Sequence, residues 1–86
     1  AFLGADGLTL EGGATTANIL MAETDRKMVE RARKTVLVVD SSKIGQAGFV
    51  PICPISTFNI LITDTNTPSD FIESVKQMGV EVIVTD

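Results

Sequence analysis

The C-terminal part of the chain contains the signals that most restrict its fold. Residues 60 to 63 read Ile-Leu-Ile-Thr and residues 80 to 85 are rich in β-branched side chains, so both segments predict strands. Between them, Thr67 and Pro68 suit the N-cap and the first position of a helix, and Gly79 suits its end. Two strands joined by a helix are almost always parallel, with a right-handed connection. The sequence therefore predicts a βαβ unit.

Two helices are predicted, and each has one apolar face. In the C-terminal helix the apolar side chains recur at positions i, i+1, i+4 and i+7, and they are Phe71, Ile72, Val75 and Met78. A longer helix is predicted from about residue 18 to residue 34, with an apolar face made of Met21, Ala22, Met28, Val29 and Ala32. We expect both helices to pack on a sheet through these faces.

Short apolar runs at residues 1 to 4 and 35 to 39 predict two more strands. The second run, Thr-Val-Leu-Val-Val, is almost continuously apolar, which is typical of parallel sheets covered by helices on both faces. The sequence thus predicts an α/β fold, a three-layer Rossmann-like domain with a mostly parallel sheet. Because the chain opens within a strand, we expect residues 1–86 to be a fragment of a larger domain.

Two segments are predicted to be loops. The glycine-rich stretch from Gly4 to Gly13 contains neither a P-loop nor a dinucleotide-binding fingerprint. The segment from Gly45 to Thr57 has a short extended piece around Phe49 and Val50, and we expect Pro51 and Pro54 to exclude a central strand there.

Composition excludes several classes of function. The 86 residues support one domain at most, and the net charge of −4 is unsuited to a surface that binds nucleic acid directly. The chain has no histidine, which removes the usual catalytic triads and the commonest metal sites. Cys53 is the only cysteine, and we interpret it as a packed thiol. No apolar run is long enough to span a bilayer. We expect a cytoplasmic domain without membrane contact, metal or cofactor.

Polar side chains follow three of the predicted strands, namely Asp6, the run Asp40-Ser41-Ser42-Lys43, and Asp64. In an open parallel sheet, ligands bind beyond the carboxyl ends of the strands. Asp6 or Asp64 alone is more often a turn former or helix cap. In residues 40–43, however, a carboxylate, two hydroxyls and an ammonium group suit a polyol or a phosphate. A further charged pair, Glu23 and Lys27, is spaced i,i+4 on the long helix, which is usually a solvated surface.

The order of these elements closely resembles the C-terminal effector domain of DeoR-type sugar-responsive transcriptional repressors. The resemblance extends over essentially all 86 residues and rests on residues 2–9, Glu23 with Lys27 and Met28, residues 39–43 with Gly45 and Phe49, and residues 61–64. It implies a cytoplasmic bacterial regulator that represses genes of carbohydrate metabolism and forms homo-oligomers. It further implies that an N-terminal helix-turn-helix domain, absent from residues 1–86, binds operator DNA, while the C-terminal domain binds a phosphorylated sugar.

That effector domain is similar in fold to ribose-5-phosphate isomerase, where a Gly-Ala-Asp element, a helix glutamate and an Asp-x-Ser-Lys element surround the sugar phosphate. Residues 4–6, Glu23 and residues 40–43 match these elements in order. The resemblance thus implies a ligand site made of Asp6, Glu23, Lys27, Asp40, Ser41, Ser42, Lys43 and Asp64. Residues 8–18 lack the lysine of the isomerase loop, so we expect a pocket without catalytic residues. Two alternatives remain open: a sugar-phosphate isomerase, and a structural module that assembles through an exposed sheet edge.

Overall fold

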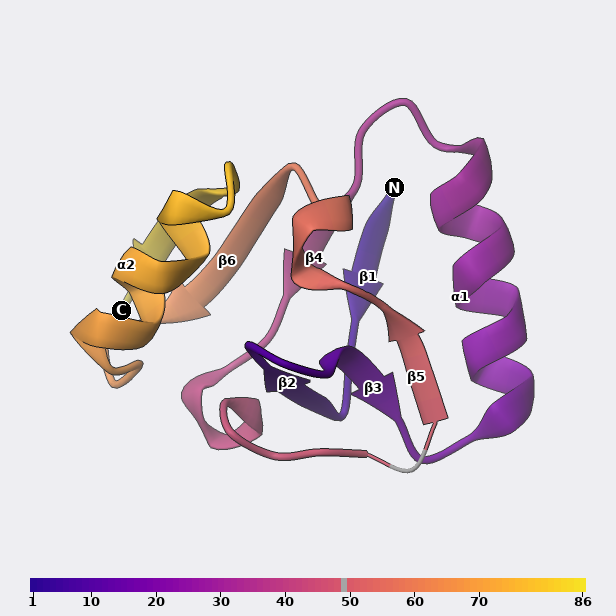
Figure 1. The fold of residues 1–86 in the computed structure, drawn as a ribbon, viewed down its shortest axis with the longest axis horizontal. Helices are drawn as coiled ribbons and strands as arrows, with labels where there is room; N and C mark the ends of the chain where they lie inside the picture. The colour runs from indigo at the N-terminus through magenta and orange to yellow at the C-terminus, as the bar shows by residue number, and fades with distance from the viewer. Residues whose placement is uncertain (49) are drawn as a thin grey trace.

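The computed structural model describes residues 1–48 and 50–86 (Figure 1). The chain forms two helices, seven strands and two short 3-10 helices within these ranges. In chain order they are β1 (Phe2–Gly4), β2 (Gly7–Thr9), β3 (Gly13–Thr16), α1 (Ile19–Arg31), β4 (Val36–Val38), η1 (Ser41–Lys43), β5 (Val50–Cys53), η2 (Ile55–Thr57), β6 (Ile60–Asp64), α2 (Ser69–Gln77) and β7 (Glu81–Thr85).

The strands form two sheets. Four of them make a sheet with the order β1-β4-β6-β7, in which every neighbouring pair is parallel. The other three make a smaller antiparallel sheet with the order β2-β3-β5. The sequence β6, α2, β7 is the predicted βαβ unit, with its two strands adjacent and parallel. The predictions of an α/β fold and of a mostly parallel sheet are confirmed.

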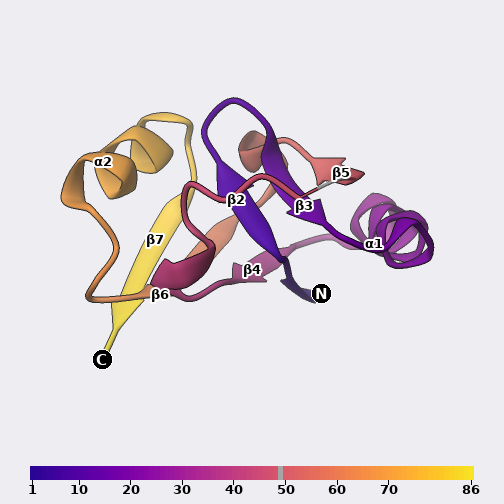
Figure 2. The same ribbon diagram turned by 90° about the horizontal axis from the view of Figure 1, so that it is seen from below.

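The core lies between the parallel sheet and the elements that pack on one of its faces. Figure 2 shows α2 and the smaller sheet on the same side of the parallel sheet, while α1 contacts β3 and β5 at the far end of the molecule. The buried apolar residues come from all of these elements. They are Leu3, Leu8, Ala14, Ala22, Leu37, Val39, Ile52, Ile55, Phe58, Leu61, Val75 and Val80. On the opposite face of the parallel sheet, Val38 and Ile83 are 45% and 39% exposed.

The glycine-rich stretch contains a strand, so the prediction of a loop there was wrong, whereas the extended piece predicted near Val50 is part of β5, an edge strand and not a central one. β2 lies inside the glycine-rich stretch and pairs as a hairpin with β3, which begins at the last residue of that stretch, Gly13, at φ +70°. These strands have three and four residues and are made mostly of glycine, alanine and threonine, so they lack the apolar alternation from which a strand is predicted. β5 runs through Pro51 at the edge of its sheet, which is where a residue without an N–H can be accommodated. Phe49, part of the predicted extended piece, lies outside the described residues.

The long helix begins as predicted and buries only part of the predicted face. Asn18 is its N-cap, and the side-chain oxygen of Asn18 accepts hydrogen bonds from the N–H groups of the first turn. Ala22 is fully buried and Val29 and Ala32 are half-buried, as predicted. Met21 and Met28 are instead 53% and 40% exposed, contrary to the prediction. The face that packs on the smaller sheet is centred on Ala22 and on Asp25, whose pKa is raised by desolvation.

The second helix is capped differently from the prediction. Its N-cap is Pro68, which makes no side-chain capping bond. Thr67, the predicted cap, is buried and its hydroxyl shares a hydrogen bond of 2.7 Å with the hydroxyl of Thr63. At the other end the prediction is confirmed, because Gly79 adopts φ +89° directly after the last turn. Val75 is the fully buried residue of the apolar stripe, whereas Met78 is exposed.

Candidate functional site at the carboxyl ends of the strands

The parallel sheet brings the three polar strand ends to one edge. β1, β4 and β6 are consecutive in the sheet and parallel, so the residues that follow them emerge side by side. Asp6 follows β1, residues 40–43 follow β4, and Asp64 is the last residue of β6. This placement is the one expected from the sequence, and it gathers three aspartates, two serines and one lysine at a single edge.

Asp6 joins the β1–β2 connection to the start of α1. Its Oδ2 accepts a hydrogen bond of 3.0 Å from the hydroxyl of Thr16 and one of 2.9 Å from the N–H of Ala17. The pKa of Asp6 is lowered, first by the Ala17 N–H, then by the Thr16 hydroxyl, and also by the positive charge of Lys43. Asp6 is therefore an ionised group whose oxygen already has two protein partners.

Asp40 caps the short helix η1. Its Oδ1 accepts a hydrogen bond of 2.9 Å from the N–H of Ser42 and a second one from the hydroxyl of the same residue. The capping bond fixes the turn on which Ser41 and Lys43 lie. Asp40 thus has a structural role at this edge, because it holds the segment that carries the lysine.

Asp64 connects β6 to the same short helix. Its Oδ2 accepts a hydrogen bond of 2.9 Å from the N–H of Ser41, and its Oδ1 accepts one of 2.9 Å from the N–H of Asn66. The pKa of Asp64 is lowered, chiefly by the Ser41 N–H, with the Ser41 hydroxyl and the Asn66 N–H adding to the effect. Asp40 and Asp64 therefore both hold the start of η1, through the N–H groups of Ser42 and Ser41.

Lys43 is the one basic residue of this cluster in the described part of the chain. It is half-buried at the end of η1, and its charge is close enough to Asp6 to lower the pKa of that carboxyl. The hydroxyls of Ser41 and Ser42 lie on the same turn. An ammonium group with neighbouring hydroxyls can bind an anionic oxygen such as that of a phosphate.

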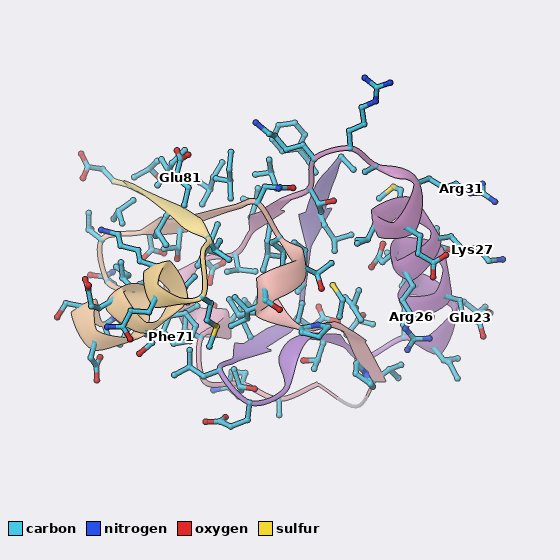
Figure 3. The ribbon with its side chains drawn as sticks, turned by 45° about the horizontal axis from the view of Figure 1, so that its top comes forward. Glu23, Arg26, Lys27, Arg31, Phe71 and Glu81 are labelled. Carbon is cyan, nitrogen blue, oxygen red and sulfur yellow. The ribbon has the colours of Figure 1, made fainter. Side chains whose placement is uncertain are left out.

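Glu23 and Lys27 lie apart from this cluster. Both are exposed on α1, and Figure 3 shows their side chains pointing outward from the helix, away from both sheets. By contrast, Arg26 turns towards β5, where its guanidinium donates a hydrogen bond to the carbonyl oxygen of Pro51 (Figure 3). The fold brings together six of the eight residues that the sequence suggested and leaves Glu23 and Lys27 on a solvated helix surface.

A cavity of about 390 Å³ lies next to the cluster and was not foreseen from the sequence. It is an open hollow bordered by the β2–β3 turn, the residues that follow η1, and the first turns of α2, and its lining includes Leu10, Glu11, Ile44, Asp70, Phe71 and Ser74. Three segments distant in sequence form it, so no local pattern could reveal it. A second hollow, of about 420 Å³, runs along one exposed face of α1 past Lys27 and Arg31.

Two kinds of feature are missing from the described part of the chain, namely a cluster of metal-binding side chains and a membrane-spanning helix. Within residues 1–48 and 50–86, no three His, Cys, Asp or Glu side chains are grouped so that they could hold a metal ion. Neither helix described here is long and apolar enough to cross a bilayer.

The sequence of this α/β domain matches that of a family of sensor domains. The family model of the DeoR C terminal sensor domain matches residues 1–65, which is most of the chain. The chain therefore belongs to the DeoR C-terminal sensor domain family, as the order of its motifs suggested.

Several curated proteins are similar to the chain over nearly its whole length. The HTH-type transcriptional regulator GlpR of Haloferax volcanii is 39% identical over 82 residues, which cover 95% of this chain and 32% of that protein. The putative aga operon transcriptional repressor of Escherichia coli O157:H7 is 36% identical over 96% of this chain and 31% of its own length. The HTH-type transcriptional repressor GlcR of Bacillus subtilis is 30% identical over the entire chain and 33% of its own length. The chain thus spans about a third of the length of these relatives.

Proposed function

We propose that this chain is the effector-binding unit of a bacterial transcriptional regulator of sugar metabolism, and that its effector is a phosphorylated sugar. The observation that supports the proposal is the meeting of Asp6, residues 40–43 and Asp64 at one edge of the parallel sheet, where ligands of such folds bind. The relatives that match the chain are named as transcriptional regulators or repressors, which supports a regulatory role.

Each polar group of the cluster has a distinct part in this proposal. Lys43 supplies the positive charge for the phosphate, and the hydroxyls of Ser41 and Ser42 donate to it by turning away from Asp64 and Asp40, to which they are bonded in this structure. Asp40 and Asp64 hold η1 in place through the hydrogen bonds that they accept from Ser42 and Ser41. A phosphate that binds at Lys43 would therefore contact η1, the segment that is hydrogen-bonded to the ends of both β4 and β6.

Regulation follows if the bound effector favours one state of the full-length protein. A ligand shifts such an equilibrium only as far as its affinities for the two states differ. We propose that the states differ in the ability of a separate N-terminal helix-turn-helix domain to bind operator DNA, in a cytoplasmic homo-oligomer. In this scheme the domain is a sensor and not an enzyme, and Glu23 has no part in proton transfer.

Binding of operator DNA by the full-length protein tests the proposal. A panel of hexose and pentose phosphates should contain at least one compound that changes operator affinity and raises the melting temperature. Lys43→Ala should weaken that response by about tenfold, since a charge-assisted hydrogen bond is lost. Lys76→Ala, on the exposed last turn of α2, is the matched control and should respond like the wild type. A panel without any effect would contradict this function, and an unchanged response in Lys43→Ala would remove Lys43 from the site.

A further inference from the structure

The cavity beside the strand ends has walls from three separate segments. Glu11 and Leu10 come from the β2–β3 turn, Ile44 follows η1, and Phe71 and Ser74 come from α2. Its volume of about 390 Å³ falls in the range of small-molecule sites. We call it the ring pocket, defined by these residues together with Thr9, Gly45, Pro68 and Asp70.

The base of the ring pocket is apolar and fixed by the core. Phe71 and Ile44 are half-buried and pack against the buried apolar cluster, as does Leu10. Gly45, at φ +82°, borders open space, because a Cβ at this position would meet no atom within 4 Å. The lining of the pocket therefore includes one aromatic and two aliphatic residues, and no side chain fills the space beside Gly45.

The polar residues of the ring pocket are two acids and two alcohols. Glu11 and Asp70 contribute carboxylates, and Thr9 and Ser74 contribute hydroxyls. One oxygen of Asp70 accepts the N–H of Phe71, and the hydroxyl oxygen of Thr9 accepts the N–H of Gly12. None of the residues that line the pocket in the described chain is basic. The two carboxylates favour donors, such as hydroxyl or ammonium groups, and disfavour an anion.

We propose that the ring pocket binds the unphosphorylated ring of the effector, with an apolar face of the sugar on Phe71 and its hydroxyl or ammonium groups on Glu11 and Asp70. This inference rests on the proposed function. It assigns the sugar ring to the ring pocket and the phosphate to a separate place. The phosphate stays with Lys43, which lies directly before Ile44 in the chain. β2 leads from Asp6, whose carboxyl lies near the charge of Lys43, to Thr9 in the pocket lining in three residues, roughly 10 Å, which a phosphorylated hexose can span.

Two-dimensional NMR on the 86-residue chain can locate each end of the ligand. Glucosamine should shift the amide signals of Glu11, Gly45 and Ser74, while inorganic phosphate should shift those of Ser42 and Lys43. Glucosamine 6-phosphate should shift both groups and should bind about tenfold more tightly than glucose 6-phosphate, since its ammonium group gains a charge-assisted hydrogen bond. Phosphate signals at the ring pocket, or sugars that leave its amides unchanged, would overturn the assignment.

Variants of the two acidic residues of the ring pocket distinguish sugar binding in this pocket from the proposed control of operator binding. Glu11→Gln and Asp70→Asn should each reduce the preference for the amino sugar severalfold, while Glu73→Gln, exposed on α2 and outside the pocket, should keep it. If sugar phosphates alter operator binding but the variants change nothing, the ring pocket is wrong and the function stands. If sugars occupy the pocket as described without affecting operator binding, the inference stands and the function fails. If no sugar binds at all, both are overturned.

Discussion

Asp64, at the end of β6, accepts a 2.9 Å hydrogen bond from the backbone N–H of Ser41, at the start of η1. This bond crosses from the third strand of the parallel sheet to the segment after the second strand, so it links two neighbouring strand ends. Because the acceptor is ionised, the geometry of the strand-end cluster depends on the charge of Asp64.

The stability of the fold should therefore decrease in acid through Asp64. The Ser41 N–H keeps the pKa of Asp64 below the ordinary value of 3.8, so the folded state binds protons less readily than the unfolded one. The resulting stabilisation is complete above the ordinary pKa and is lost as the pH falls through the lowered one. Urea denaturation from about pH 5 to about pH 2 should show a smaller loss of stability for Asp64→Asn than for the wild type. An identical pH dependence in the two proteins would contradict the role of the charge.

Local signals explain why the βαβ unit could be predicted and the hairpin could not. In residues 60–85 each strand is apolar and the helix has its stop signal at Gly79, so neighbours in sequence are also neighbours in space. The pair β2–β3 depends on a distant contact, since a Cβ on Gly7 would overlap the carbonyl group of Gln46. The requirement for glycine is visible only once residues 7 and 46 are brought together.

The same reasoning applies to the candidate site. Parallel strand order alone places Asp6, Asp40 and Asp64 at one edge, so their convergence followed from the sequence. Whether a helix residue reaches that edge depends on which layer the helix packs against. α1 packs on β3 and β5, and Glu23 consequently faces solvent. The error at Met21 has the same origin, because α1 buries its face against a sheet that was not predicted.

Cys53 should react slowly with alkylating reagents. Burial raises its pKa from 9.0 to about 11, and the negative charge of Asp25 contributes while Arg26 opposes it. At pH 8 the thiolate population should be roughly 100-fold lower than in the unfolded chain. Iodoacetamide kinetics with and without urea will measure the ratio. A native rate close to that in urea would show that Cys53 is not the packed thiol that the sequence suggested.

Two adjacent residues of β4 allow a matched test of the core. Leu37 is almost fully buried against the core, whereas Val38 points to the opposite face. Leu37→Ala should reduce the free energy of unfolding by about 3 kcal/mol through lost burial and a residual cavity. Val38→Ala should cost under about 1 kcal/mol, because its side chain is partly solvated. Urea denaturation of both variants checks the difference, and equal losses would mean that the face of β4 is assigned wrongly.

Two glycines with positive φ should tolerate alanine to different degrees. Gly79, at φ +89°, has open space around the position of a Cβ, so Gly79→Ala should cost only the backbone strain of about 1 kcal/mol. At Gly13, φ is +70° and a Cβ would overlap the carbonyl oxygen of Cys53 across the β3–β5 pairing. Gly13→Ala should therefore cost more than about 2 kcal/mol, because the clash adds to the strain. Thermal denaturation of both variants will show whether Gly13 is the more sensitive position.

The buried hydroxyl pair of Thr63 and Thr67 should show strong coupling. The two oxygens are 2.7 Å apart beneath the loop that joins β6 to α2, and both residues are shielded from water. Thr67→Val alone should reduce the free energy of unfolding by about 1–3 kcal/mol, since it leaves the Thr63 hydroxyl buried without this partner. Replacing both threonines by valine removes both polar groups, so the double variant should be less destabilised than the sum of the single variants. A double-mutant cycle in urea measures this coupling. Strict additivity would mean that Thr67 is retained for its shape and not for the bond it makes with Thr63.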